Sequence, residues 1–483
     1  MLVALYTSRV VINVLGVEDF GIYNIIGGIV VLFSFLNSAM TNATQRFFSY
    51  ELGRNDNQRL NKVFNVSIIC HVVVSLIVLI LAETIGLWFV NTQLNIPNDR
   101  VTAAQWVYQF SILTFILNVI RVPYNAIIIS YERMSLYAYI TIAEASFKLL
   151  AVFILRYLSF DKLILYAILM ALVTLLCNLV YFLYCKIKFE CCKSFEVEKD
   201  RAIYRQLSSF FGWSLLGGAS NVGAQYGGNI LINIFHGVTV NAGFGVANQV
   251  SHAVSTFVNN FQMAFNPQLV KLYAQKNEKE LNALIMRSAL FSFYLMWVIS
   301  LPLMINMPFI LRLWLGTVPP YADAFCILML LYYLVDAIQA PLFMTIYATG
   351  RIRNYQIWLS SIIILNIPLS WILLSIGYSP VVVIAVRLIL NIISSIIRTF
   401  YIKKLLSFDI HTYTKSVIGR ALLISALSFT LAALVKITLN AFVGEFVLVI
   451  ASFIIVCLMT WFIGLARAER VSLTRIILSI IIK

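Results

Sequence analysis

Basic side chains occur inside long apolar segments of this sequence, where their charge is costly. A charged side chain at the centre of a bilayer costs about 2.5–3.5 kcal/mol even on the scale from insertion experiments, so such a residue suggests a function. Arg9, Arg121 and Arg387 stand in apolar segments with no acidic residue nearby in the sequence. We therefore expect these three arginines to line a polar cavity.

Two acidic positions in apolar segments have competing interpretations. Glu144 and Lys148 are spaced i, i+4, so on one helix they either neutralise each other or both face the cavity. Asp336 is an isolated acid, which suits proton or sodium coupling, although a buried structural hydrogen bond explains it equally well. We keep Lys148 as a cavity cation, and Glu144 and Asp336 as candidates for ion coupling.

A glycine-rich stretch, GGASNVGAQYGGN at residues 217–229, combines small and polar residues. Gly223 and Gly227 form a GxxxG pattern, which permits close contact between membrane helices. Glycine also weakens a helix, so a bending hinge is the alternative. The amides of this stretch are candidates for lining the cavity: Asn221, Gln225 and Asn229.

The composition indicates which elements carry these residues. Of 483 residues, 61% are hydrophobic and 11% are charged, whereas soluble domains carry about 25% charged residues. Apolar runs of about 20 residues, the length that crosses a bilayer, recur from residues 1–15 to 446–466. We predict an all-α polytopic membrane protein with about 14 transmembrane helices, because barrel strands would alternate in polarity over about ten residues.

Lys and Arg gather in alternate connections of this predicted topology. The basic connections include residues 46–62, 186–206 and 398–420, whereas the intervening ones are nearly free of basic residues. Because short cytoplasmic loops collect Lys and Arg, both termini are predicted to be cytoplasmic. The net charge of +15 then follows from topology and attraction to anionic lipid headgroups, and no nucleic acid partner is expected.

The sequence also contains an internal repeat. YTSRVVINVLG at residues 6–16 resembles YGGNILINIFHG at 226–237, and DFGIYN at 19–24 corresponds to GFGVAN at 243–248. Polar residues keep this register further on, which unrelated apolar helices would not do. We predict two six-helix lobes related as parallel repeats, and sites in repeat-built transporters lie between such halves.

The repeat sets the predicted domain limits. The first lobe covers residues 1–185, a cytoplasmic linker 186–206, the second lobe 207–402, and two additional helices with a cytoplasmic tail 403–483. The first helix is shorter than its counterpart, so either it is truncated or Met1 is not the true start. Cys and His show no spacing typical of a metal site, and neither metal, cofactor nor disulfide is expected.

Several motifs resemble one family. TSRVVINVLGVEDFGIYNIIGG, ATQRFFSYELGRND, RVPYNAIIISYERM and FNPQLVKLYAQKN are similar to polysaccharide repeat-unit flippases of the multidrug/oligosaccharidyl-lipid/polysaccharide exporter superfamily. The resemblance implies alternating access by two lobes that move an undecaprenyl-pyrophosphate-linked oligosaccharide across a bacterial inner membrane. It implies membrane lipids and H⁺ or Na⁺ as further partners. An arginine-lined cavity suits such a cargo, because the planar guanidinium matches phosphate oxygens.

Two other functions compete with this interpretation. A drug exporter of the same superfamily would favour acids and aromatics for cationic drugs, whereas the embedded charges here are mostly basic. A membrane polysaccharide polymerase would need a large external loop with catalytic residues. The longest predicted external loop, at residues 91–104, has no carboxylate pair or nucleophile constellation, so we expect a transporter and not an enzyme.

Overall fold

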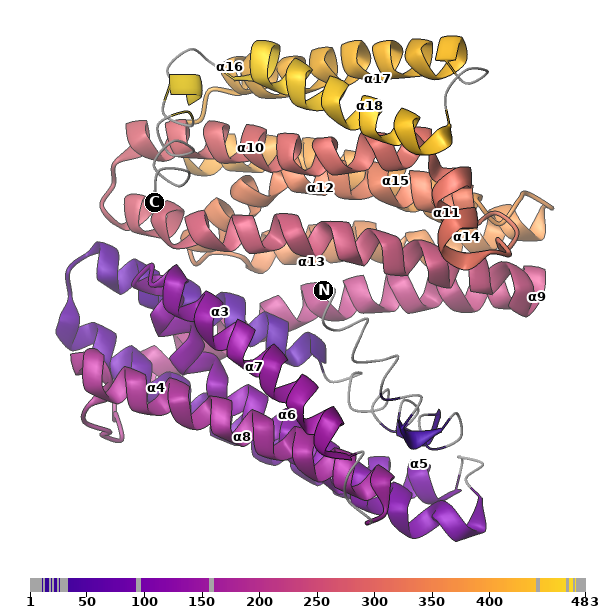
Figure 1. The fold of residues 1–483 in the computed structure, drawn as a ribbon. Helices are drawn as coiled ribbons and strands as arrows, with labels where there is room; N and C mark the ends of the chain where they lie inside the picture. The colour runs from indigo at the N-terminus through magenta and orange to yellow at the C-terminus, as the bar shows by residue number, and fades with distance from the viewer. Residues whose placement is uncertain are drawn as a thin grey trace. The chain divides into compact units, whose positions relative to one another are not determined.

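The computed structural model of this chain is built from long helices (Figure 1). Its described part contains no strand, and ten of its helices are long and apolar enough to cross a membrane. The predicted all-α multi-pass architecture is confirmed, while the number of fourteen spans stays a prediction. The described residues are 11, 14–16, 19, 21–23, 26, 34–92, 97–155, 160–439, 444–465, 469–471 and 474.

The chain divides into two compact units, Met1–Ala219 and Ser220–Lys483. The domain limits inferred from the repeat stay predictions. In the first unit the elements are α3 (Ser34–Gly53), α4 (Asn57–Leu81), the π-helix η1 (Ala82–Gly86), α5 (Leu87–Thr92), η2 (Asn98–Arg100), α6 (Val101–Ser130), α7 (Met134–Leu155), α8 (Lys162–Lys188) and η3 (Glu190–Cys192).

The helix α9 (Arg201–Ala274) begins in the first unit and continues into the second. It consists of two helices that meet at Gly237, whose φ of 78° and ψ of −178° are not helical. The second unit continues with α10 (Glu278–Ile305), α11 (Met307–Leu315), α12 (Ala322–Ala348), α13 (Arg353–Ile364), α14 (Asn366–Ser375), α15 (Val382–Leu405), α16 (Ile410–Tyr413), η4 (Thr414–Ile418), α17 (Gly419–Leu439), α18 (Glu445–Met459) and η5 (Thr460–Gly464).

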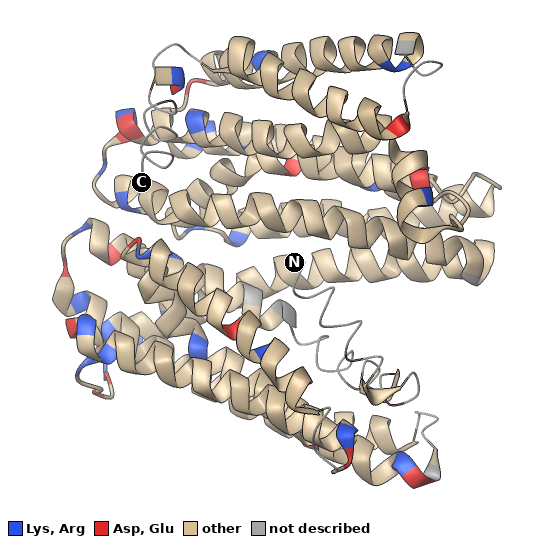
Figure 2. Ribbon diagram, in the orientation of Figure 1, with Lys and Arg blue, Asp and Glu red and all other residues tan. Residues whose placement is uncertain are grey.

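Apolar composition and charge placement explain these helices. The candidate spans have mean hydropathies of 1.8 to 2.8, and a helix satisfies its own backbone hydrogen bonds in lipid. Lys and Arg lie mostly at helix ends and in connections (Figure 2). Helices extend into the predicted loops, and two of the basic residues there are buried: Arg46, since α3 extends to Gly53, and Arg398, since α15 extends to Leu405. Both side chains are 6% exposed.

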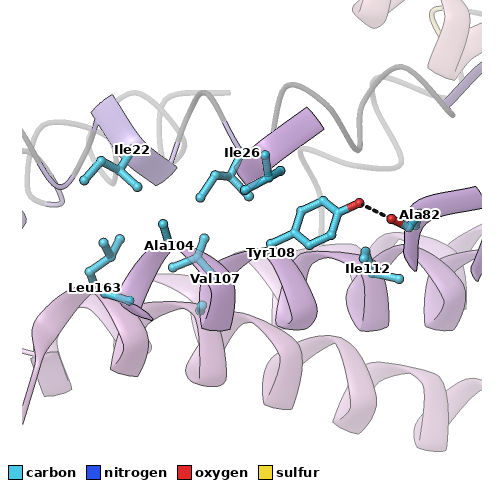
Figure 3. Close-up of a cluster of buried hydrophobic side chains, with 11 residues drawn as sticks. Ile22, Ile26, Ala82, Ala104, Val107, Tyr108, Ile112 and Leu163 are labelled. Atoms are coloured by element: carbon cyan, nitrogen blue, oxygen red, sulfur yellow. Dashed lines mark hydrogen bonds between the residues drawn. The ribbon is translucent and has the colours of Figure 1, made fainter. Parts of the chain in front are cut away.

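The largest fully buried side chain described in the first unit, that of Tyr108, lies against a π-helical turn. The hydroxyl of Tyr108, on α6, donates a hydrogen bond to the carbonyl of Ala82 at 2.7 Å (Figure 3). Gly86 leaves room for that hydroxyl, since a Cβ there would lie 2.0 Å from the Tyr108 oxygen. Ile22, Ile26 and other apolar side chains pack around the ring.

Corresponding turns in the two units share a rare backbone conformation. A positive φ is uncommon for residues other than glycine, yet it recurs at repeat-related positions whatever the residue type. Within the part of the chain that the structure describes, the backbone therefore repeats as the sequence does. The pairs are Gly16 and Gly237 (φ 85° and 78°), Asn55 and Lys276 (56° and 57°), and Glu132 and Gly350 (59° and 74°).

The last two long helices of the described chain, α17 and α18, dock on α10 through polar contacts. Tyr294 donates to the carbonyl of Gly464 at 3.0 Å, and Trp297 donates to the hydroxyl of Ser428 at 2.9 Å. The ammonium group of Lys436 donates to the carbonyl of Ile305, the last residue of α10, at 2.6 Å. Lys436 therefore has a structural partner. All these contacts lie within the second unit.

Candidate functional site

A cluster of charges in the first unit lies on α6 and α7, next to a tyrosine of α8. Glu144 accepts from Arg121 at 3.0 Å and from Lys148 at 2.7 Å, so one carboxylate holds two cations. The guanidinium of Arg121 also lies 5.5 Å from the ring centre of Tyr181, on α8. The ion pair corrects the expectation that Arg121 has no acidic partner, because the partner lies on the next helix. Glu144 and Lys148 form the i, i+4 ion pair, while their roles in a cavity stay predictions.

A second cluster of charges lies in the second unit on α12 and α15, next to a tyrosine of α13. Arg387 lies over the ring of Tyr332, with its guanidinium 4.6 Å from the ring centre. Asp336 is one helical turn beyond Tyr332 on α12 and is half-buried. Asn391, one turn beyond Arg387, donates to the carbonyl of Tyr332 at 3.1 Å and fixes α15 against α12.

Arg398 belongs to the same cluster, although its position in the sequence suggested a cytoplasmic loop. Its Nε donates to the hydroxyl of Tyr355, on α13, at 2.8 Å, and its guanidinium lies 5.6 Å from the ring centre of Phe343. Arg387 and Arg398 are three helical turns apart, so they share one face of α15. That spacing, and the basic end of α15 marked by Lys403 and Lys404, could have indicated Arg398 from the sequence.

The acids of the two clusters differ in their partners. Glu144 is saturated by two ion pairs, whereas Asp336 makes no ion pair within the described part of the chain. Arg398 and Arg387 are the cations that act electrostatically on Asp336. Gln339, which corresponds to Arg121 in the repeat, is 1% exposed, and its side-chain oxygen accepts no hydrogen bond from a described residue. The second cluster therefore keeps two cations that no neighbouring carboxylate pairs directly.

The end of the glycine-rich stretch packs closely, at Gly227 and Gly228, whereas a Cβ on Gly223, the first glycine of the GxxxG pattern, would meet no atom within 4 Å. A Cβ on Gly227 would lie 2.8 Å from Ile367, on α14, and a Cβ on Gly228 would lie 3.1 Å from Val383, on α15. The non-helical backbone of α9 is at Gly237, beyond this stretch. Its amides are less buried: Gln225 lies 3.5 Å from Asn248 as a weak hydrogen bond, Asn229 is half-buried and Asn221 is exposed.

Arg9 lies outside the described residues, and whether Arg121 and Arg387 share a cavity stays a prediction. The seven cysteines are free thiols. In the described ranges no three His, Cys, Asp or Glu side chains are placed to share a metal ion.

Comparison with known proteins identifies the family behind this arrangement. Residues 1–264, more than half of the chain, match the protein family described as polysaccharide biosynthesis protein. The chain belongs to this family. Together with the apolar helices, membership makes it a multi-pass membrane protein of the transporter class, as the resemblance of its motifs predicted.

Solved structures agree with this family on the fold. An outward-facing multidrug resistance MATE family transporter of the MOP superfamily is 14% identical, with a TM-score of 0.72, over 83% of this chain and 90% of that one. A MATE structure in complex with MaD3S is 13% identical, with a TM-score of 0.71, over 84% and 92% of the two chains.

A third structure is a MOP superfamily transporter from Pyrococcus furiosus, described as having a binding pocket of reversed polarity that suggests a different function. It is 14% identical, with a TM-score of 0.65, over 83% and 90% of the two chains. A search of curated proteins found no match. The family thus shares the MATE-type fold at low sequence identity.

Proposed function

We propose that this protein flips a lipid-linked oligosaccharide across the membrane by alternating access, and that Arg387 holds the phosphate of the cargo. The carrying observation is that Arg387 lies against Tyr332 in a membrane helix and has no carboxylate partner among the described residues. An arginine neutralised by an acid would offer little to an anion. An arginine held by an aromatic ring keeps its charge and its donors.

The cargo that fits best is an undecaprenyl-pyrophosphate-linked repeat unit. Its pyrophosphate is anionic and accepts the two parallel hydrogen bonds of a guanidinium. Tyrosine rings of the second cluster suit a sugar, because Tyr332 and Tyr333 near Arg387 and Tyr355 beside Arg398 offer both apolar faces and hydroxyls. The polyprenyl tail would stay in lipid while the charged head crosses in the protein.

The first cluster contributes differently in this proposal. Arg121 and Lys148 share the single carboxylate of Glu144, so this triad carries one net positive charge. It would attract the anionic pyrophosphate, but each cation would first have to weaken its ion pair with Glu144. We therefore assign the main phosphate contact to Arg387 and a supporting role to Arg121.

Ion coupling fits Asp336 better than Glu144. A group that couples H⁺ or Na⁺ must change its charge or ligands during the cycle, and Glu144 is fixed by two ion pairs. Asp336 stands near Arg387 and Arg398 without a direct ion pair in the described part of the chain. Binding H⁺ or Na⁺ at Asp336 would change the charge that faces the phosphate. We place the protein in a bacterial inner membrane with both termini in the cytoplasm.

Pocket polarity has been linked to function in a structure with this fold. The Pyrococcus furiosus transporter is described as having a pocket of reversed polarity. A basic cluster in the present chain agrees with an anionic cargo and disfavours the cationic drugs expected of a drug exporter.

The test replaces Arg387 by Ala and by Lys in a host that lacks the endogenous gene. Charge-assisted hydrogen bonds contribute about 1.5–3 kcal/mol, so Arg387→Ala should lower export about 10- to 100-fold at matched membrane level. Arg387→Lys should restore export only in part, because an ammonium lacks the bidentate fork. Arg312→Ala is the control, since Arg312 is an exposed arginine with an acidic partner, Glu445, at 3.3 Å.

The assay measures how lipid-linked glycan distributes between the two leaflets. Normal export by Arg387→Ala would overturn the phosphate assignment. Normal leaflet distribution in cells that lack the protein altogether would overturn the flippase assignment itself.

A further inference from the structure

Arg100 joins three connections at the end of the first unit opposite the basic turns. Its Nη2 lies 2.6 Å from Asp19, and its Nη1 lies 2.7 Å from Asp161. Asp19 is the acid of the DFGIYN motif and is 7% exposed in its side chain, whereas Arg100 and Asp161 are about one-third exposed. A single guanidinium therefore bridges a buried and a half-buried carboxylate. We call these three residues the Arg100 bridge.

The bridge stands at the start of α6 and α8, which carry Arg121 and the tyrosine beside it. Arg100 is the N-cap residue of α6, which carries Arg121. Asp161 is the N-cap residue of α8, which carries Tyr181, and it accepts hydrogen bonds from the backbone N–H groups of Leu163 and Ile164. From the bridge, about 20 residues of each helix, or ~30 Å, lead to Arg121 and Tyr181. The two helices therefore start at the same height along their axes, and Arg121 and Tyr181 lie at the same height as each other.

We propose that Arg100 is a positioning residue that fixes the axial register of α6 and α8, so that Tyr181 stays beneath Arg121. The inference rests on the proposed function, because it concerns how the supporting cation is held for the cargo. Sliding α8 along α6 would separate the guanidinium of Arg121 from the ring, which are 5.5 Å apart. The two ion pairs resist that sliding at the helix ends, and they add to the packing of Leu163, at the start of α8, in one buried cluster with Ala103 and Ala104, at the start of α6.

The second unit uses backbone packing at the corresponding place. In the repeat Asp19 corresponds to Gly243, and a Cβ on Gly243 would lie 2.5 Å from the carbonyl oxygen of Pro320, in the connection before α12. The second unit therefore brings α9, at Gly243, and the connection before α12 together by close approach, without charges. This equivalence supports a positioning role for the charged version in the first unit.

The decisive variant is Asp161→Asn. Asparagine caps a helix as well as aspartate does, so α8 keeps its cap while the ion pair to Arg100 is lost. Because misplacing a catalytic or binding group by about 1 Å can cost up to 100-fold, we expect export to fall about 10-fold with little change in thermal stability. Two matched controls should export normally: Asp409→Asn, which changes a helix cap that makes no ion pair among the described residues, and Glu445→Gln, which removes an exposed ion pair.

A covalent tether separates positioning from charge. In a cysteine-free background, Arg100→Cys with Asp161→Cys should lower export, and joining the two cysteines with a short bis-thiosulfonate reagent should restore most of it. The reagent should not restore export in Arg100→Cys alone. Further loss on tethering would overturn the inference, since it would mean that the bridge has to open during transport.

The outcomes also separate this inference from the function on which it rests. Normal export by Asp161→Asn, while Arg121→Ala is defective, would overturn the positioning role alone. Normal export by both variants would remove Arg121 from cargo binding, and with it the reason for positioning Tyr181.

Discussion

Replacing Gly86 by Ala should destabilise the first unit far more than the addition of one methyl group suggests. The new Cβ would lie 2.0 Å from the Tyr108 hydroxyl and 3.3 Å from the adjoining ring carbon. The hydroxyl would have to move, and the carbonyl of Ala82 would lose its donor at 2.7 Å. An unsatisfied buried group costs about 1–3 kcal/mol, and overpacking costs about 1–3 kcal/mol more.

A double-mutant cycle tests this account. Tyr108→Phe removes the donor but also the atom that the methyl group meets, so it should cost only about 1–3 kcal/mol. Gly86→Ala should then cost less than about 1 kcal/mol in the Tyr108→Phe background, because only the 3.3 Å approach remains. The measurement is the free energy of unfolding in detergent micelles.

The control for this cycle is Gly223→Ala in α9, where a Cβ would meet no atom within 4 Å. This change should be neutral or stabilise by up to about 1 kcal/mol, because alanine favours a helix. Equal costs of Gly86→Ala in the wild type and in Tyr108→Phe would refute the clash as the cause.

Three further predictions concern stability in detergent, measured by thermal unfolding. Glu144→Gln should lower the free energy of unfolding by about 1–3 kcal/mol, because two half-buried cations lose their carboxylate, and an unchanged midpoint would contradict the saturated-acid description. Glu132→Gly should stabilise by about 1 kcal/mol and Gly350→Ala should destabilise similarly, since both sites have a positive φ; opposite signs would exclude backbone strain. Lys436→Met should destabilise by about 1–3 kcal/mol by leaving the carbonyl that it caps without a donor, and a stabilised variant would argue against capping.

The sequence predicted the architecture because the signals for membrane helices are long and repeated. Apolar runs, basic connections and the duplication each pointed to the same all-α, multi-pass arrangement. The errors fell at helix ends, where α3 and α15 continue past the point at which charge suggested a loop. A basic residue buried against aromatic rings, such as Arg46 over Phe47 and Tyr50, looks like a loop residue in a hydropathy profile.

The partners of the embedded charges could not be read from local spacing. Arg121 and Glu144 are 23 positions apart and lie on different helices. Only the packing of α7 on α6 brings their side chains to 3.0 Å. The same holds for Arg398 and Tyr355, which come from different helices. Residue type indicated candidate positions for chemistry, whereas tertiary packing decides which of the charged ones pair with a carboxylate.

The polar docking of α17 and α18 on α10 has a consequence for how the chain is made. During synthesis α10 enters the membrane before α17 and α18 are translated. Until then the indole of Trp297 lacks its acceptor, Ser428, and the carbonyl of Ile305 lacks its donor, Lys436. A chain that stops short of α17 would leave these groups facing lipid, where unsatisfied polar groups cost several kcal/mol. Membrane proteases that survey newly inserted helices could then distinguish unfinished chains from complete ones, so the last two helices would act as a checkpoint on completion.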